Sequence, residues 1–144
     1  MTTVAISGGF DPLHIGHIKL MKGARALGDR LVVILNNDNW LMKKKGFVFM
    51  PENERKTVLE AIRHVDQVVM TSHEADTKDV SVCKEIETLR PDIFANGGDR
   101  KEDNIPECDL CGKLGIKMVF NVGGGKEQSS SELVRRTKGT DHVT

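Results

Sequence analysis

Two histidines, His14 and His17, lie three residues apart directly behind a glycine-rich segment, residues 7–13, which reads SGGFDPL. The short apolar run Val4–Ile6 precedes this segment and a helical pattern follows it. The histidines therefore lie where a strand passes through a turn into a helix. The start of a helix presents free backbone N–H groups and the positive end of its dipole, which both attract phosphate. Two imidazoles at that place predict a site that binds a polyphosphate and stabilises the charge that develops on it during a reaction.

A plain surface turn is the alternative interpretation of this segment, since an isolated pair of histidines at this spacing is more often just that. Gly8 and Gly9 favour the phosphate site because glycine lets a backbone come close to a ligand. Pro12 fixes one backbone dihedral of the turn. Asp11 is a candidate for a water-mediated metal contact or for holding the turn, and we prefer the second role.

The composition is that of an ordinary globular chain: 144 residues, 38% of them hydrophobic and 29% charged. This length suits one domain with one core, which we expect over residues 1–138, followed by a flexible tail over residues 139–144. Basic and acidic residues both number 21, so the formal net charge is zero and any affinity for phosphate must come from local clusters. Zero net charge and 4% aromatic residues disfavour a nucleic-acid partner.

The chain has no apolar run that could span a bilayer, and its N-terminus lacks the basic and apolar regions of a signal peptide. We therefore expect a cytoplasmic protein without a membrane partner. The three cysteines, Cys83, Cys108 and Cys111, disfavour a disulfide framework, and we expect reduced thiols. Cys108 and Cys111 have zinc-ligand spacing, but no second pair of ligands is visible, so we predict no metal site in the protein.

Short apolar runs alternate along the chain with longer segments of helical periodicity. This alternation predicts an α/β fold, a doubly wound, five-stranded parallel sheet. We expect strands over Val4–Ser7, Leu31–Leu35, Gln67–Met70, Ile93–Ala95 and Lys117–Val122. We expect helices over Gly16–Leu27, Glu52–Arg63, Thr77–Arg90 and Pro106–Leu114, and a last one from Ser130 or Ser131 to Lys138.

Ligands of such sheets bind outside the carboxyl ends of the strands, at the point where the strand order reverses. The loops that follow the expected strands are therefore the places where chemistry is expected. These loops are residues 8–17, 36–50, 71–76, 96–105 and 123–131.

Residues 8–17 resemble the Gly-x-Phe-Asp-x-x-His-x-Gly-His signature of the cytidylyltransferase-like nucleotidyltransferases, without a break. The resemblance extends over nearly the whole chain, from Val4 to about Arg136. It implies the Rossmann-like fold of that family and catalytic roles for His14 and His17. It also implies that residues of this turn bind the nucleotide, namely Gly8, Gly9, Phe10, Asp11 and Gly16.

Three consecutive lysines, Lys43, Lys44 and Lys45, follow the second expected strand within the loop at 36–50. Such a run is usually just solvated. At the carboxyl end of a sheet, however, the compact charge of lysine is suited to neutralising phosphate oxygens. Members of the family carry lysines in this loop that hold the triphosphate, so the resemblance implies a catalytic role for Lys44 and Lys45. Asp38, in the same loop, is a candidate for binding the substrate.

Arg55 and Arg63 lie eight residues apart in an expected helix, so they share roughly one helix face. That face could be no more than an exposed basic surface. The segment resembles the Arg-Lys…Ile-Arg-x-Val-Asp stretch of glycerol-3-phosphate and sugar-phosphate nucleotidyltransferases. The resemblance implies that Arg55 and Arg63 bind substrate or support a subunit contact, and it extends to Asp66.

The segment Asn96–Arg100, which reads NGGDR, follows the fourth expected strand. By itself it is ordinary turn chemistry. In the family a Gly-Gly-Asp segment at this place contacts the ribose and base, so the resemblance implies nucleotide binding by Gly97 and Asp99.

Residues 123–131, which read GGGKEQSSS, precede the last expected helix and form a second candidate anion site at a helix start. A flexible linker with an N-cap serine is the alternative. The resemblance implies nucleotide binding by Lys126, Ser129, Ser130 and Ser131. Lys126 would stand in for an arginine of the glycerol-phosphate cytidylyltransferases.

These features together predict a nucleotidyltransferase that transfers NMP from CTP or ATP to a phosphorylated small molecule, glycerol 3-phosphate or a sugar phosphate, and releases pyrophosphate. The attacking phosphate is already an anion, so the site has to position the reactants and neutralise charge. We expect Mg²⁺ to accompany the nucleoside triphosphate, and the family implies a homodimer. The alternatives are an adenylyltransferase of the pantetheine-phosphate or nicotinamide-mononucleotide type, and a non-catalytic nucleotide-binding module on the same fold.

Overall fold

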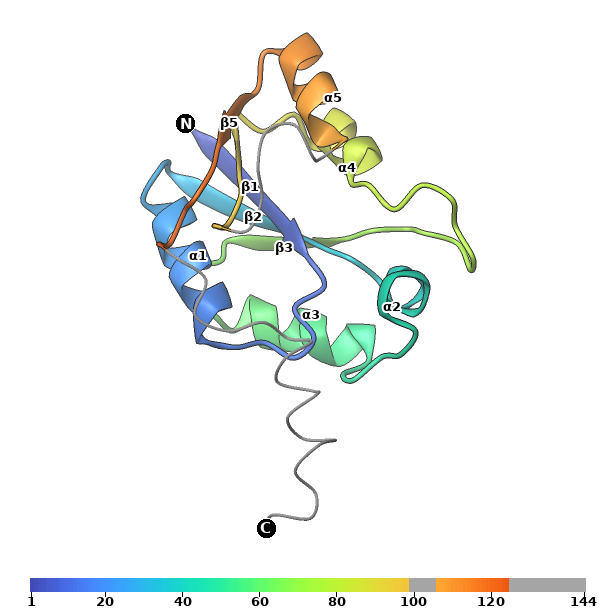
Figure 1. Ribbon diagram of the computed structural model, residues 1–144. Coiled ribbons are helices and arrows are strands. Elements are labelled where there is room, and N and C mark those ends of the chain that lie inside the picture. Colours follow the sequence, from blue (N-terminus) through green and yellow to red (C-terminus); the bar gives the residue numbers. More distant parts are fainter. Residues whose placement is uncertain (99–105, 125–144) are drawn as a thin grey trace.

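The computed structural model describes residues 1–98 and 106–124. Within these residues, five parallel strands form one sheet in the order β3-β2-β1-β4-β5 (Figure 1). The predicted α/β class and the parallel sheet are confirmed. The strands are β1 (Thr3–Gly8), β2 (Arg30–Leu35), β3 (Gln67–Met70), β4 (Ile93–Ala95) and β5 (Lys117–Val119).

Helices cover both faces of the sheet, as a doubly wound fold requires. Side chains of α1 and α3 enter one core cluster and those of α4 and α5 enter another on the opposite face. Because all strands run in parallel, every loop that follows a strand reaches the same edge, called here the carboxyl edge. The helices are α1 (Ile15–Arg25), α2 (Asp38–Lys45), α3 (Glu52–Glu60), α4 (Cys83–Leu89) and α5 (Glu107–Leu114).

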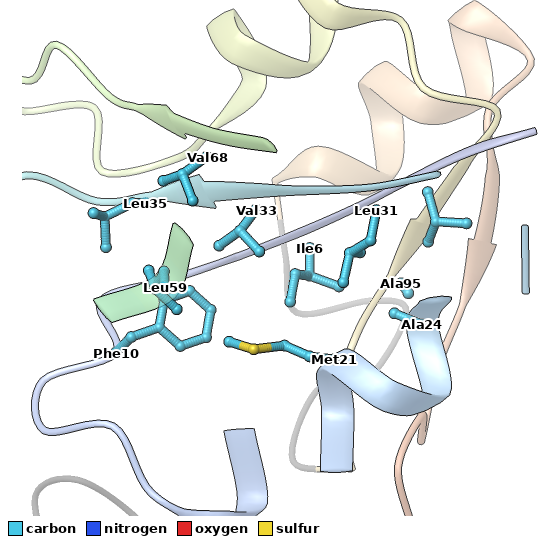
Figure 2. Close-up of a cluster of buried hydrophobic side chains, with 11 residues drawn as sticks. Ile6, Phe10, Met21, Ala24, Leu31, Val33, Leu35, Leu59, Val68 and Ala95 are labelled. Atoms are coloured by element: carbon cyan, nitrogen blue, oxygen red, sulfur yellow. The ribbon is translucent and has the colours of Figure 1, made fainter. Parts of the chain in front are cut away.

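The middle residues of the central strands β1 and β2 are apolar and fully buried, because helices cover both faces of the sheet. Ile6 and Leu31 pack against α1 and α3, whereas Ala5 and Ile34 pack against α4 and α5. Figure 2 shows the first of these clusters, in which Phe10 of the turn after β1 lies beside the core side chains of the sheet and helices. The turn that carries the histidines is thereby anchored in the core.

Helix α2 lies in a segment that the sequence reading assigned to a loop, residues 36–50. Asn37 is its N-cap and accepts a hydrogen bond from the Trp40 N–H at 3.0 Å, which satisfies a donor of the first turn. Gly46 ends the helix in the left-handed conformation, with φ of 81°. The three lysines form its last turn, where the negative end of the helix dipole favours cations. The lysines therefore lie on a helix and not in a loop.

Other boundaries also differ from the expected ones. Helix α3 ends at Glu60 rather than Arg63, β5 ends at Val119 rather than Val122, and α4 begins at Cys83 rather than Thr77. The late start of α4 has a local cause, because the Asp79 carboxylate accepts hydrogen bonds from the backbone and side chain of Ser81 and so holds a turn. Within the described residues, no helix is long and apolar enough to cross a membrane. The last expected helix and the tail at 139–144 lie outside the described residues.

Candidate active site

The two histidines cap helix α1 reciprocally. His14 is the N-cap residue, and its Nδ1 accepts the Gly16 N–H at 3.1 Å. In return, Nδ1 of His17 accepts the backbone N–H of His14 at 3.2 Å. This is a capping box built from imidazoles instead of the usual hydroxyl and carboxylate. Because both Nδ1 atoms are acceptors, each neutral ring carries its proton on Nε2, where it can donate to a phosphate oxygen.

The two imidazole rings and Phe10 form one aromatic stack. The ring centroids of His14 and His17 are 3.9 Å apart with an interplanar angle of 29°, and Phe10 meets His17 edge-on at 4.9 Å. Phe10 is 4% exposed and has a positive φ of 51°. Its ring therefore joins the histidines to the core cluster of Figure 2. Such packing restricts the orientation of both imidazoles before any ligand arrives.

Close packing within the protein also requires glycine at two positions of this turn. A Cβ atom at Gly8 would lie 3.1 Å from the Phe10 ring. A Cβ atom at Gly9 would lie 2.9 Å from Leu41 and 3.2 Å from Trp40 of α2. The turn after β1 and helix α2 thus pack against each other at the carboxyl edge.

Asp11 holds this turn to the segment between α2 and α3. Its two carboxylate oxygens accept the backbone N–H groups of Phe49 at 2.7 Å and Met50 at 2.6 Å. The residue is 1% exposed. These contacts match the preferred one of the two roles considered for Asp11. The preceding glycine-rich turn continues through a cis peptide bond between Asp11 and Pro12.

Arg55 joins three parts of the carboxyl edge through a fully buried guanidinium group. Its Nε donates to the Met50 carbonyl at 2.9 Å. One terminal nitrogen, Nη1, donates to the carbonyls of Gly9 at 2.8 Å and Asn36 at 2.6 Å. The other, Nη2, donates to Oδ1 of Asp38 at 2.7 Å. Arg55 and Asp38, both expected to bind substrate, therefore form an ion pair with each other. The other hydrogen bonds of the Arg55 guanidinium are made to backbone carbonyls of the protein.

Arg63 lies away from the histidine site. It is exposed in the turn after α3, four residues before β3 begins, and so at the edge of the sheet opposite to His14 and His17. Asp66, in the same turn, accepts the N–H of Leu31 at 2.7 Å and lies 3.1 Å from the Arg25 guanidinium. Because α3 ends at Glu60, Arg55 and Arg63 do not share a helix face.

The three lysines of the run lie in the last turn of α2. Lys43 Nζ lies 2.9 Å from Oδ1 of Asp76, in the loop after β3. This hydrogen bond, together with the lysine charge, holds the pKa of Asp76 below its ordinary value. Lys44 is exposed and Lys45 is half-buried in the same last turn of α2. Both remain candidates for the triphosphate.

Buried polar side chains flank the end of β1, and the sequence pattern did not single them out as site residues. Asn36 directly follows β2 and Asn96 directly follows β4, the two neighbours of β1. Among the residues that the structure describes, the Asn36 Oδ1 and the Asn96 Nδ2 are buried and meet no hydrogen-bond partner, and the same holds for Oε1 of Glu107 at the start of α5. Leaving such groups unpaired is costly, so a bound molecule could use them. The only sequence signal is that each asparagine is the first polar residue after a buried strand.

The second half of the expected nucleotide site is described only where it begins. Gly97 is half-buried in the segment after β4. Gly123, the first residue of the expected second anion loop, lies against α1: a Cβ there would be 2.8 Å from the Leu20 nitrogen. The loop after β5 is thereby brought to the helix that carries His17. The other candidates of this half, Asp99, Lys126, Ser129, Ser130 and Ser131, lie outside the described residues.

The cysteines are free in the structure. Burial raises the pKa of Cys111 to about 11, so its side chain is an unreactive thiol at neutral pH. Among the described residues, no group of three or more His, Cys, Asp or Glu side chains is placed to hold a metal ion.

Comparison with known proteins shows a family and several relatives to which this chain is similar. The model of a family described as cytidylyltransferase-like matches residues 5–136. The bifunctional protein HldE of Gluconobacter oxydans is 38% identical over 134 residues, which are 92% of this chain and 26% of HldE, so the chain spans about a quarter of that relative. The FAD synthase of Pyrococcus abyssi is 41% identical over 116 residues, 80% of this chain and 75% of the synthase. A solved lipopolysaccharide core biosynthesis protein from Thermoplasma volcanium superimposes with a TM-score of 0.66 at 30% identity, covering 83% of this chain and 95% of the other.

Proposed function

Because the chain belongs to the cytidylyltransferase-like family, we propose that it transfers a nucleoside monophosphate from a nucleoside triphosphate to a phosphorylated small molecule, with release of pyrophosphate. The observation that carries the proposal is the reciprocal capping of α1 by His14 and His17. It fixes two Nε2 donors at a helix start, a place where backbone groups already attract phosphate.

In the proposed reaction, a phosphate oxygen of the acceptor forms a bond to the α-phosphorus of the triphosphate. The bond from that phosphorus to the bridging oxygen breaks in line, and pyrophosphate leaves with the electron pair. A phosphate monoester is already ionised near neutral pH, so no general base is needed. His14 and His17 donate to oxygens of the reacting α-phosphate, while Lys44 and Lys45 neutralise the β- and γ-phosphates.

In this proposal Arg55 and Asp38 position the site and do not contact the substrate. The buried pair of Arg55 and Asp38 fixes the turn after β1 relative to the start of α2. The pair therefore keeps the distance and orientation between the histidines, which follow the turn, and the lysines, which end α2, constant. Positioning of this kind contributes to rate because misplacement of reacting groups by about 1 Å can lower it about 100-fold.

ATP is the nucleotide that we propose first, and CTP second. FAD contains an adenylyl group, and relatives named FAD synthase reach 41% identity to this chain. An adenylyl transfer to a phosphorylated acceptor is therefore the form of the reaction that the relatives favour. A sugar phosphate or glycerol 3-phosphate is the proposed acceptor, and the alternative is an acceptor of the flavin, pantetheine or nicotinamide nucleotide type.

Magnesium enters this proposal together with the triphosphate. The described residues hold no metal cluster of their own, and both oxygens of Asp11 already accept backbone hydrogen bonds. A cation held mainly by the phosphates fits these residues, since Mg²⁺ is commonly bound through substrate phosphates and few carboxylates. It would neutralise charge on the triphosphate.

The test is a thermal-shift series with ATP, CTP, GTP and UTP, followed by a pyrophosphate-release assay with phosphorylated acceptors. We expect ATP to give the largest shift and at least one acceptor to release pyrophosphate. Nucleotide binding without release for any acceptor would instead identify a non-catalytic nucleotide-binding module. We also propose a homodimer, which light scattering at micromolar concentration would test.

A further inference from the structure

The loop after β5 lies directly against the backbone of helix α1. A Cβ atom at Gly123 would lie 2.8 Å from the Leu20 nitrogen and 2.9 Å from the Lys19 carbonyl oxygen, which both belong to α1. From the other side, a Cβ atom at Gly23 of α1 would lie 2.9 Å from Cγ1 of Val122 and 3.1 Å from the Gly123 nitrogen. Such short distances would force a neighbour to move, so glycine at both positions permits the two segments to touch.

Helix propensity alone does not explain Gly23. The residue lies inside α1, where glycine is less favourable than alanine because it loses more backbone freedom on folding. Gly112, inside α5, shows the contrast. Among the described residues, a Cβ atom at Gly112 would meet nothing within 4 Å apart from its own helix backbone and chain neighbours. Close packing therefore accounts for Gly23 and not for Gly112.

The chain between β5 and α1 is also bonded to the end of β4. Val122 donates its backbone N–H to the Asn96 carbonyl at 3.0 Å, and Asn96 donates its own N–H to the Val119 carbonyl at 2.8 Å. The Val122 side chain packs, partly buried, against the first core cluster. Residues 120–124 thus join the end of β4 to the middle of α1, and we call them the bridge. Figure 1 shows this part of the chain running from β5 to α1.

The bridge adjoins several segments of the proposed nucleotide site. Asn96 begins the segment after β4, and Gly123 and Gly124 begin the second candidate anion loop, whose remaining residues 125–131 lie outside the described residues. Helix α1, which the bridge touches, is the helix that begins at the histidines. The contact between the bridge and α1 therefore fixes where that loop starts relative to the histidines.

We propose that Gly23 and Gly123 are positioning residues for nucleotide binding, which act through the bridge and do not touch the nucleotide. A side chain at either position would displace the bridge from α1, and a displacement of about 1 Å at a reacting site can lower a rate about 100-fold. This inference rests on the proposed transferase function and adds to its site two residues outside the signature at 8–17. A purely structural contact would affect stability alone, so nucleotide affinity distinguishes the two roles.

The experiment measures nucleotide affinity in four variants and the parent. Isothermal titration calorimetry with ATP and Mg²⁺, without acceptor, gives the Kd in the absence of transfer. Gly23→Ala inserts a methyl group into the contact, Val122→Ala removes the atom nearest to that methyl group, and a double variant combines the two. Gly112→Ala is the matched control, because it makes the same change inside a helix where no other segment lies close. Thermal melts record the stability of each variant without ligand.

We expect Gly23→Ala to bind ATP about tenfold more weakly than the parent, because the bridge must move away from the new methyl group. Val122→Ala should bind about threefold more weakly, because a smaller side chain holds the bridge less firmly. Since the two residues touch, the double variant should resemble Val122→Ala and fall well short of the product of about thirtyfold. Gly112→Ala should bind within about twofold of the parent.

Parent-like affinity in both Gly23→Ala and Val122→Ala would show that the bridge does not position the site, even if their melting temperatures fall. Multiplication of the two losses in the double variant would also overturn the proposal, since the contact would then not be their common cause. If Gly23→Ala does not fold, Val122→Ala decides: weaker binding supports the proposal and parent-like binding overturns it. In all these cases the transferase function stands. If the parent binds none of the four nucleoside triphosphates, the proposed function itself fails and the positioning role fails with it.

Discussion

Arg55 and Asp38 form an ion pair of 2.7 Å that is buried on one side only: the arginine side chain is 0% exposed and the aspartate side chain 36%. The arginine is held between the turn after β1 and the end of β2 by the carbonyls of Gly9 and Asn36. Asp38 begins α2, the helix that ends in the three lysines. One buried cation thus connects the segment that leads to the histidines with the helix that carries the lysines.

Substitution of Arg55 should destabilise the whole protein. In Arg55→Ala, Asp38 loses its partner and the Gly9 and Asn36 carbonyls lose their donor, so the free energy of unfolding should fall by about 3–5 kcal/mol. Urea unfolding followed by circular dichroism measures this change. Arg63→Ala is the control, since Arg63 is exposed in a turn and its removal should change stability by no more than about 0.5 kcal/mol. Equal effects of the two substitutions would contradict the positioning role of Arg55.

Substitution of His17 separates its capping role from its chemical role. His17→Ala removes both, whereas His17→Gln keeps a side-chain acceptor at the third helical position, where glutamine completes ordinary capping boxes. We expect His17→Gln to retain more stability than His17→Ala, which should lose about 1 kcal/mol. Both variants should lose at least about 100-fold in turnover, as enzymes do when one donor to a developing charge is removed.

Stability is read from thermal melts and turnover from pyrophosphate release at saturating nucleotide. A His17→Gln enzyme within about threefold of the parent rate would show that the imidazole is not needed for transfer.

Local sequence patterns predict the strands of the sheet and the start of α1. The strands were predictable because each is a short apolar run, and the start of α1 because a glycine-rich turn passes there into a helical pattern. The same kind of signal was present for α2 and was missed. Asn37 is a good N-cap residue and Gly46 a good helix stop, but the sequence analysis places the run Lys43–Lys45 in a phosphate-binding loop.

Long-range contacts could not be predicted in the same way. Arg55 binds backbone carbonyls of Gly9 and Asn36, and a carbonyl has no side-chain identity that a sequence pattern could reveal. The resemblance to a family grouped Arg55 with Arg63, which the fold places at opposite edges of the sheet. That separation depends on where α3 ends, and helix ends are among the least predictable features of a sequence.

A methyl group at Gly9 should be costly, whereas one at Gly112 should be favourable. In Gly9→Ala the new Cβ would lie 2.9 Å from the Leu41 side chain and 3.2 Å from the Trp40 ring. These buried side chains must then move, and the free energy of unfolding should fall by about 1–3 kcal/mol. In Gly112→Ala, within α5, the new Cβ meets no atom of the described residues within 4 Å apart from its own helix backbone and chain neighbours. Alanine is also the better helix former, so stability should rise by about 0.5–1 kcal/mol. Denaturant unfolding of both variants measures the contrast. A Gly9→Ala protein as stable as the parent would show that the turn and α2 are not closely packed.

Cys111 should make stability depend on pH in the alkaline range. Burial raises the pKa of its thiol to about 11 from an ordinary value of 9.0. A raised pKa means that the folded state favours the protonated thiol, so this contribution to stability is complete below pH 9 and is lost as the pH rises toward 11. Urea unfolding at pH 8, 9, 10 and 11 should show a fall in the free energy of unfolding that is smaller in Cys111→Ala, with Cys108→Ala as the control on the same helix.

Alkylation tests the burial of the same thiol. At pH 7.5 iodoacetamide should modify Cys111 only after unfolding, because the native thiol is neutral and buried. Rapid alkylation of Cys111 in the native protein, mapped by mass spectrometry, would contradict its burial between α5 and the sheet.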